Sequence, residues 1–114
     1  MATDVFAQAR FIPVSAQKAR LVADLVRGKG VVDALTMLKF TPNQAAHPVS
    51  KVVASAMANG EENYGVSRED LIIYRITVDE APTRKWRRFG ARGRFKPWLR
   101  RSSHITVTLR EREA

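Results

Sequence analysis

Residues 71–110 constrain the fold of this chain most strongly, because the two ends of the stretch have the pattern of strands and the middle does not. Apolar residues occupy every second position at each end. They are Ile72, Tyr74, Ile76 and Val78 in the first strand, and Ile105, Val107 and Leu109 in the second. A period of two is typical of strands that bury one face. We therefore predict one long β-hairpin whose two apolar rows face the core.

The middle of this hairpin is strongly basic. Between Arg84 and Arg101 there is no acidic residue, and the nine basic residues are Arg84, Lys85, Arg87, Arg88, Arg92, Arg94, Lys96, Arg100 and Arg101. The whole chain has 20 Lys and Arg against 11 Asp and Glu, so removing these nine leaves 11 against 11. The net charge of +9 therefore lies entirely in the hairpin. A ribbon of like charges repels itself in water, which indicates an anionic partner outside the chain.

Four aromatic residues are interleaved with these bases. They are Trp86, Phe89, Phe95 and Trp98. A guanidinium binds phosphate through two parallel N–H groups and also stacks on bases, and aromatic rings stack on unpaired bases. The combination favours folded RNA, which exposes bases in loops and bulges. The alternative for the aromatics is that they pair across the two strands and stiffen the ribbon.

The outer part of the hairpin is predicted to protrude. Gly90 and Gly93 indicate the turn, because glycine accepts a positive φ and close approach of another backbone. Each arm from Ala81 to this turn would extend roughly 30–40 Å at about 3.3 Å per residue. Basic residues fall on both faces, so this part cannot pack against its own domain. We predict a single domain, with a globular body of residues 1–80 and 102–114 and a basic arm of residues 81–101.

Composition fits one small globular protein. A chain of 114 residues buries roughly 60–70% of the surface that its unfolded form exposes. No stretch approaches the roughly 18 apolar residues of a membrane span, and residues 1–14 lack the pattern of a secretory signal. The sequence has no cysteine, which rules out disulfides and thiolate metal sites and fits a reducing compartment. A cytoplasmic location is expected.

The first 40 residues predict a strand and two helices. The strand covers Val5–Ile12, where Val5, Ala7, Ala9 and Phe11 alternate with Gln8 and Arg10, and the apolar Phe6 and Ile12 interrupt the pattern. Ser15 is a candidate N-cap for a helix that runs to Arg27, and Gly28 can supply the left-handed residue that closes it. The apolar stripe of this helix is Leu21, Val22, Leu25 and Val26. The second helix is predicted over Val31–Lys39, from apolar residues spaced three and four apart.

A third helix is predicted from Thr41-Pro42 to Met57 or Asn59, with a buried stripe of Val49, Val52, Val53 and Ala56. Pro48 either kinks this helix or starts it, because a proline ring clashes with the preceding helical turn. Residues 59–67 read as a turn-rich connection. Strands and helices segregate along the chain, so the expected class is α+β, with three helices packed on a small antiparallel three-stranded sheet and a long protruding β-hairpin.

Several stretches resemble the family of the bacterial large-subunit ribosomal protein twenty-two. They are SAQKARLVADLVRGK, KVVASAMANGEEN, VDEAPTRKWRR, ARGR and RRSSHITV, and the likeness covers nearly the whole chain in the order of the family. ARGR followed by SHITV after a basic hairpin is the most specific part. The resemblance implies an α+β body at the outer surface of the large subunit and a hairpin that penetrates ribosomal RNA and lines the polypeptide exit tunnel. It also implies roles in subunit assembly and in contact with nascent chains.

The resemblance assigns functional positions to this chain. The tunnel tip corresponds to Gly90, Ala91, Arg92, Gly93 and Arg94. The basic RNA contacts of the arms correspond to Lys85, Arg88, Arg100 and Arg101, and those of the first helix to Lys18, Arg20 and Arg27. The predicted RNA-binding set adds the other basic and aromatic candidates of the arm, which are Arg84, Trp86, Arg87, Arg92, Arg94 and Lys96. Three positions depart from the family pattern: Trp86 where a basic residue is usual, Gly90 where proline is common, and Gly60 where alanine often follows the asparagine. The third departure is expected to loosen the end of the third helix.

No catalytic or metal site is predicted. His47 and His104 are far apart in sequence, and no cysteine completes a zinc site. The acidic pairs Glu61-Glu62 and Asp79-Glu80 are adjacent in sequence and read as solvated turn residues. Phosphate-loop, hydrolase and dinucleotide motifs are missing. We expect neither an enzyme nor a cofactor, and we interpret His104 as a hydrogen-bonded residue at the base of the hairpin.

Two other functions compete with a ribosomal one. An architectural DNA-binding protein could wrap a groove with a β-ribbon arm, and such proteins are usually dimers. A cationic arm could also bind a membrane surface, although this arm lacks a continuous apolar face. The leading interpretation has large-subunit ribosomal RNA, neighbouring ribosomal proteins and the nascent polypeptide as partners, with no membrane and no homo-oligomer.

Overall fold

A computed structural model describes residues 4–82, 84–89 and 95–112, and it describes side chains for residues 4–82 and 101–112. The first strand, β1 (Asp4–Ile12), is followed by helices α1 (Ala16–Val26), α2 (Val31–Lys39) and α3 (Ala46–Tyr64). A short 3₁₀ turn, η1 (Arg68–Asp70), leads into β2 (Leu71–Glu80). The chain continues through β3 (Arg84–Phe89) and β4 (Phe95–Arg100) and ends in β5 (Ser103–Glu111).

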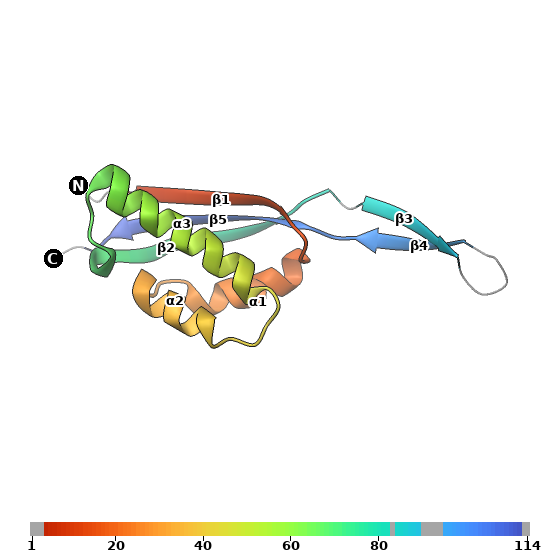
Figure 1. The fold of residues 1–114 in the computed structure, drawn as a ribbon, viewed down its shortest axis with the longest axis horizontal. Coiled ribbons are helices and arrows are strands. Elements are labelled where there is room, and N and C mark those ends of the chain that lie inside the picture. The colour runs from red at the N-terminus through yellow and green to blue at the C-terminus, as the bar shows by residue number, and fades with distance from the viewer. Residues whose placement is uncertain (1–3, 83, 90–94, 113–114) are drawn as a thin grey trace.

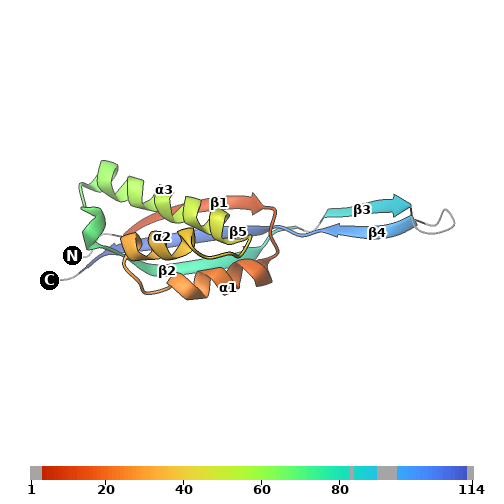
Figure 2. The ribbon, with the colours of Figure 1, turned by 60° about the horizontal axis from the view of Figure 1, so that its bottom comes forward.

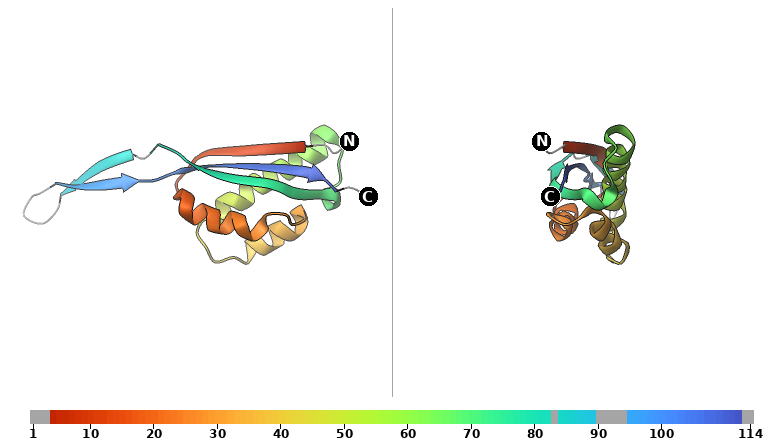
Figure 3. Two further views of the ribbon diagram at one scale, coloured as in Figure 1. Left: turned by 180° about the vertical axis from the view of Figure 1, so that it is seen from behind. Right: turned by 90° about the vertical axis from the view of Figure 1, so that its left-hand side faces the viewer.

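The body of the protein is one antiparallel sheet covered by helices. Strand β5 lies in its centre, between β1 and β2, and the order is β1-β5-β2. The three helices cover one face of this sheet, which is clearest when the molecule is seen end-on in Figure 3. The core lies between the two layers, and its largest fully buried side chains come mainly from the sheet, among them Leu71, Ile73, Ile76, Ile105 and Leu109. The predicted α+β class with three helices and a three-stranded sheet is confirmed.

Strand β2 does not keep the period of two that the sequence suggests. Its register against β5 shifts between Ile73 and Arg75, where β2 has an extra residue. This bulge puts Ile73 and Ile76 in the core, whereas Ile72 is only half-buried and Tyr74 is 48% exposed. The prediction that Ile72 and Tyr74 face the core is therefore wrong, because one extra residue exchanges the two faces of a strand.

Helix α1 also buries a different stripe from the predicted one. The Ser15 hydroxyl accepts a hydrogen bond from the Lys18 N–H, which confirms the N-cap. Val22 and Val26 are buried as predicted, but Leu21 and Leu25 are 61% and 47% exposed. The buried face is completed by alanines, which are Ala16, Ala19 and Ala23. These small side chains let the helix backbone lie close to the sheet, and this packing rather than side-chain size decides which face turns inward.

Helix α2 matches its predicted bounds, and the segment between α1 and α2 is tied to β2. Gly28 has a φ of +82°, so the predicted left-handed glycine is confirmed. Its N–H donates to the carbonyl of Ile73 at 2.9 Å, and the Ile73 N–H donates to the carbonyl of Lys29 at 2.9 Å. The glycine therefore turns the chain onto the free edge of β2.

Helix α3 begins and ends later than predicted. Thr41 and Pro42 precede it, and Asn43 forms the turn at its start, with its side chain accepting from the Ala45 N–H at 3.0 Å. Pro48 is the third residue of the helix, where its missing N–H has no intrahelical partner to lose, so it fits without a kink. Gly65, with a φ of +66°, closes the helix.

Gly60 lies inside helix α3 and not in a connecting turn. It is buried, and a Cβ at this position would lie 2.9 Å from Cδ1 of Leu71. The absence of a side chain thus lets α3 approach the start of β2 and the side chain of Val5. The prediction of a turn from residue 59 is wrong because a glycine that weakens an isolated helix is used here for close packing.

The basic segment forms a separate two-stranded ladder. Strands β3 and β4 pair only with each other in the described part of the sheet topology. Figures 1 and 2 show this ladder beyond the end of the helices, continuing the direction of β2 and β5. The principal dimensions of 66 × 25 × 18 Å reflect this elongation. The predicted turn at Gly90 and Gly93 lies outside the described residues.

Candidate nucleic-acid interface

The backbone register of the arm places like residues opposite each other. Trp86 pairs with Trp98, and Phe89 pairs with Phe95, as the cross-strand alternative for the aromatics predicts. The basic pairs are Arg84 with Arg100 and Arg88 with Lys96. Like charges directly opposite each other destabilise an antiparallel pair, and an isolated two-stranded ribbon is at best marginally stable in water. An anion that neutralises the bases would therefore stabilise the ladder as well as bind it.

The two faces of the arm differ in composition. Neighbours along a strand belong to opposite faces, so the register divides the arm into two sets of positions. One set is Arg84, Trp86, Arg88, Lys96, Trp98 and Arg100, and the other is Lys85, Arg87, Phe89, Phe95, Pro97 and Leu99. Basic positions outnumber apolar ones by four to two on the first face, and the ratio is reversed on the second. Both faces combine charge with apolar groups, so neither has the composition of a protein core.

The positions of the predicted tunnel tip, which are Gly90, Ala91, Arg92, Gly93 and Arg94, lie outside the described residues.

Two predicted RNA-binding arginines, Arg20 in α1 and Arg27 at its C-cap, contact the protein itself. The guanidinium of Arg20 donates from Nε and Nη2 to the carbonyl of Val78, at 3.1 and 3.0 Å. Arg27 donates from Nη2 to the carbonyl of Ile76 at 2.8 Å and also forms an ion pair with Asp24. These bonds satisfy carbonyls on the outer edge of β2, which would otherwise be free to pair with another strand. The sequence gives no local signal for this role, because the partners are 49 and 58 residues away.

Both arginines are exposed residues despite these bonds. The Arg27 side chain is 47% exposed, and a guanidinium has five N–H donors. A guanidinium fixed on one side by a carbonyl loses less conformational freedom when it binds phosphate on the other. Arg20 and Arg27 can therefore bind the β2 carbonyls and an RNA phosphate at the same time.

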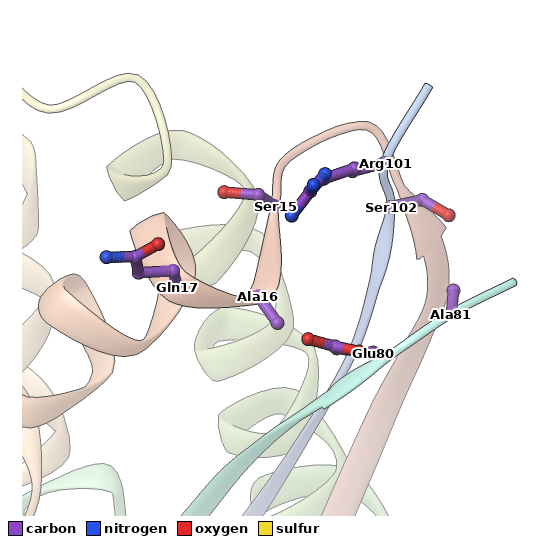
Figure 4. Close-up of a pocket in the computed structure, with 7 residues that line it drawn as sticks. All are labelled: Ser15, Ala16, Gln17, Glu80, Ala81, Arg101 and Ser102. Carbon is purple, nitrogen blue, oxygen red and sulfur yellow. The ribbon is translucent and has the colours of Figure 1, made fainter. Parts of the chain in front are cut away.

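The root of the arm has a small hollow next to the start of α1. Its volume is about 80 Å³, and it is lined by Ser15, Ala16, Gln17, Glu80, Ala81, Arg101 and Ser102. Arg101 is exposed, and Figure 4 shows its side chain extending toward the turn that precedes α1. Lys18 is exposed on the same end of α1. Arg101 and Lys18 thus extend the basic surface from the arm onto the body.

His104 fixes the neighbouring strand at this root. Its Nδ1 accepts a hydrogen bond from the backbone N–H of Phe11 at 3.0 Å, which confirms the predicted hydrogen-bonded role. Because Nδ1 accepts this bond, the proton of the neutral ring lies on Nε2. The sequence did not identify Phe11 as the partner, since that contact spans 93 residues.

An ion pair fastens the opposite end of the sheet. Asp4 accepts from Nε of Arg110 at 2.7 Å and from Nη2 at 3.1 Å. This hydrogen bond lowers the pKa of the Asp4 carboxyl and raises the pKa of Arg110. The same guanidinium lies 3.5 Å from the centre of the Tyr74 ring, where it makes a cation–π contact. The exposed Tyr74 thus has a partner on the open face of the sheet.

Among the helices that the structure describes, none has the length and apolar composition to cross a membrane. Within the same described ranges, no cluster of three or more His, Cys, Asp or Glu side chains could hold a metal ion.

Comparison with known proteins decides the family. The family model described as ribosomal protein L22p/L17e matches residues 7–110 of this chain. The chain belongs to that family. A curated relative, the large ribosomal subunit protein uL22 of Pediococcus pentosaceus, is 46% identical over 111 residues, which cover 97% of this chain and 94% of the relative. The resemblance read from the sequence is confirmed.

Membership of the L22p/L17e family bears on the whole chain, since the match includes the body and both strands of the arm. The basic ladder is therefore part of a ribosomal protein, and the body presents it at the end of the sheet.

Proposed function

We propose that this L22p/L17e protein is a structural constituent of the large ribosomal subunit that binds ribosomal RNA through its basic arm. The observation that carries the proposal is the separation of charge: the arm holds all of the net charge of +9, and it forms its own ladder beyond the body. The curated relative is itself named as a large-subunit protein.

The arm has the chemistry that folded RNA requires. Arginines bind phosphate through paired N–H groups, and the aromatics offer stacking surfaces to unpaired bases. Recognition would follow the shape of the RNA and not a base code, because these contacts are made to phosphates and to the faces of bases. Lys18, Arg20, Arg27 and Arg101 would extend the contact from the arm onto α1.

The finer roles follow from where the arm would end. Inserted into ribosomal RNA, it would hold RNA segments together during subunit assembly, and its tip at residues 90–94 would line the polypeptide exit tunnel. Nascent chains would then pass the tip, and neighbouring ribosomal proteins would contact the body. This role places the protein in cytoplasmic ribosomes as a single copy without a homo-oligomeric partner.

The test is co-sedimentation with large ribosomal subunits through a sucrose gradient in high salt. We expect the intact chain to travel with the subunit, and a variant without residues 84–101 to bind more weakly. Finding the intact protein only at the top of the gradient, or on duplex DNA as a dimer, would favour the architectural DNA-binding alternative.

Two variants of equal net charge test whether RNA binding depends on the bases of the arm or only on the total charge of the protein. One variant replaces Arg84, Arg88, Arg100 and Arg101 by Gln, and the other replaces four exposed bases of the body, which are Lys39, Lys51, Arg75 and Arg112. Each lowers the net charge of +9 by four. A protein with six to ten phosphate contacts loses about 10³- to 10⁵-fold in affinity between 50 and 200 mM salt. We expect the arm variant alone to flatten this salt dependence, and equal loss in both variants would contradict the proposal.

A further inference from the structure

The end of β1 contains an exposed phenylalanine in a strained backbone conformation. The pairing of β1 with β5 shifts between Ala9 and Ile12, whose partners are Ile105 and Ser103, so β1 has one extra residue there. Phe11 lies in this bulge with a φ of +55°, and it is the one non-glycine residue with a positive φ in the described part of the chain. This conformation is unfavourable for a bulky side chain, and surrounding contacts must enforce it. Bulges of this kind redirect a side chain.

His104 supplies the enforcing contacts. It accepts the hydrogen bond from the Phe11 N–H at 3.0 Å. The two rings also meet at 88°, with their centres 4.8 Å apart, in an edge-to-face contact. Despite these contacts the Phe11 side chain remains 58% exposed, although the alternation of β1 would have placed it toward the core. The fold thus keeps an aromatic ring in solvent even though the backbone conformation at this residue is unfavourable.

The charged surroundings of this ring indicate what could cover it. Arg10, the preceding residue, is exposed, and Arg101 is exposed two residues before Ser103, the partner of Ile12. The acidic residues across β5 are Asp79 and Glu80 of β2, which pair with His104 and Ser103 on the side away from β1, and Glu80 lines the hollow that Arg101 also lines. Arg10 therefore adjoins Phe11 in β1 and Arg101 precedes the strand that pairs with it, whereas both carboxylates belong to β2, on the other side of β5.

We propose that Phe11, held by His104, is a stacking site for an unpaired base of large-subunit ribosomal RNA at the root of the arm, with Arg10 and Arg101 contacting the flanking phosphates. This inference rests on the proposed function and extends it to a residue outside the basic arm. A base provides a flat ring and a nearby phosphate together, which matches an exposed aromatic ring with exposed arginines nearby in the sequence and in the strand pairing. His104 acts here as a positioning residue, through its contacts with Phe11.

Variants at residue 11 distinguish the effect of the aromatic ring on binding from the effect of backbone strain on stability. Phe11→Leu removes the aromatic ring and keeps a side chain at positive φ, whereas Phe11→Gly removes the ring and also relieves the backbone. Phe11→Tyr keeps a stacking ring. Phe6→Leu is the matched control, since Phe6 is a 68% exposed phenylalanine of the same strand that lies farther from the arm.

The measurements are the melting temperature of each protein and its affinity for large-subunit ribosomal RNA transcribed in vitro, at fixed salt. Base–aromatic stacking corresponds to a loss of roughly 5- to 150-fold in affinity when the ring is removed. We expect this loss in both Phe11→Leu and Phe11→Gly, with Phe11→Gly melting at the higher temperature of the two. Phe11→Tyr and Phe6→Leu should bind like the parent protein. Ultraviolet cross-linking of the parent complex should give a nucleotide adduct at Phe11.

Three outcomes would overturn the inference. Affinity that follows melting temperature, with Phe11→Gly binding better than Phe11→Leu, would mean that Phe11 is only structural. Unchanged RNA affinity with poorer incorporation of both variants into subunits would identify a protein neighbour as the occupant. In both of these cases the parent protein still binds ribosomal RNA and the proposed function stands. A parent protein that does not bind ribosomal RNA would remove the proposed function as well.

Discussion

Excising the arm should leave a folded body, and the structure indicates where to cut. The Ala81 N–H donates to the carbonyl of Ser102 at 3.1 Å, a backbone bond that joins the two strands at the root of the arm. Residues 82–101 can therefore be replaced by Asn-Gly, the preferred pair for a two-residue hairpin turn between antiparallel strands. The new chain would have 96 residues, because 20 of the 114 are replaced by two.

The expected change in stability is zero or positive. Strands β3 and β4 pair only with each other among the described strands, so the excision removes no pairing from the body. Shortening the connection from 20 residues to two lowers the entropy cost of closing it by up to about 2 kcal/mol, from (3/2)RT ln 10. Removing nine like charges also removes repulsion. About 1 kcal/mol shifts the melting temperature of a domain of this size by roughly 4–8 °C.

Calorimetry or circular dichroism of the excised protein beside the full chain tests this reasoning. We expect one cooperative transition at the same temperature or up to about 15 °C higher, within the range that 2 kcal/mol allows. A second variant that replaces the same residues by a flexible 20-residue Gly-Ser linker keeps the loop length and should lose most of the gain. A non-cooperative transition, or a fall in melting temperature for the Asn-Gly variant, would show that the arm is part of the core.

Three further predictions concern the body. Val53→Asp places a carboxylate at a fully buried position of α3 and should abolish the cooperative thermal transition, since an unpaired buried charge is strongly destabilising. The control Ser55→Asp, on the exposed side of the same helix, should melt within a few degrees of the parent protein. Equal effects of the two variants would mean that α3 faces the other way. Arg27→Ala should lower the free energy of unfolding in urea by about 0.5–1.5 kcal/mol, through loss of the bond to a β2 carbonyl, and no change would limit this arginine to contacts outside the chain. The hydrogen bond from Arg110 holds the pKa of Asp4 below its usual value of 3.8. The folded state therefore binds fewer protons, and the contribution of the pair to stability is present above about pH 4 and lost as the pH falls. An NMR titration should show the Asp4 pKa returning upward in Arg110→Gln, and an unchanged titration would exclude that bond in solution.

The features that the sequence predicted correctly depend on neighbours along the chain. The hydroxyl of Ser15 caps a helix that starts at the next residue, and Gly28 supplies a positive φ two residues after that helix ends. The basic arm was predicted from charge and spacing alone, because nine like charges cannot share a core with the rest of the chain. The family resemblance rested on similarly contiguous stretches, and the match over residues 7–110 confirmed it.

The errors have one physical source, which is packing between distant elements. Leu21 and Leu25 are more apolar than the alanines of α1, yet the alanines face the sheet because they allow a closer approach. Gly60 weakens a helix in isolation but is needed where α3 meets Leu71. The two bulges that redirect Tyr74 and Phe11 arise from the register of three strands, and no single strand shows them in its own sequence.

The sequence by itself therefore determined the class of fold, the existence of the arm and the strongly cationic character of that arm, because composition, charge and periodicity are local properties. Only the tertiary structure decided that Arg20 and Arg27 bind the edge of β2 and that His104 holds Phe11 in solvent. These contacts join residues between 49 and 93 positions apart. Such pairs are brought together only when the helices cover the sheet and the strands choose their register.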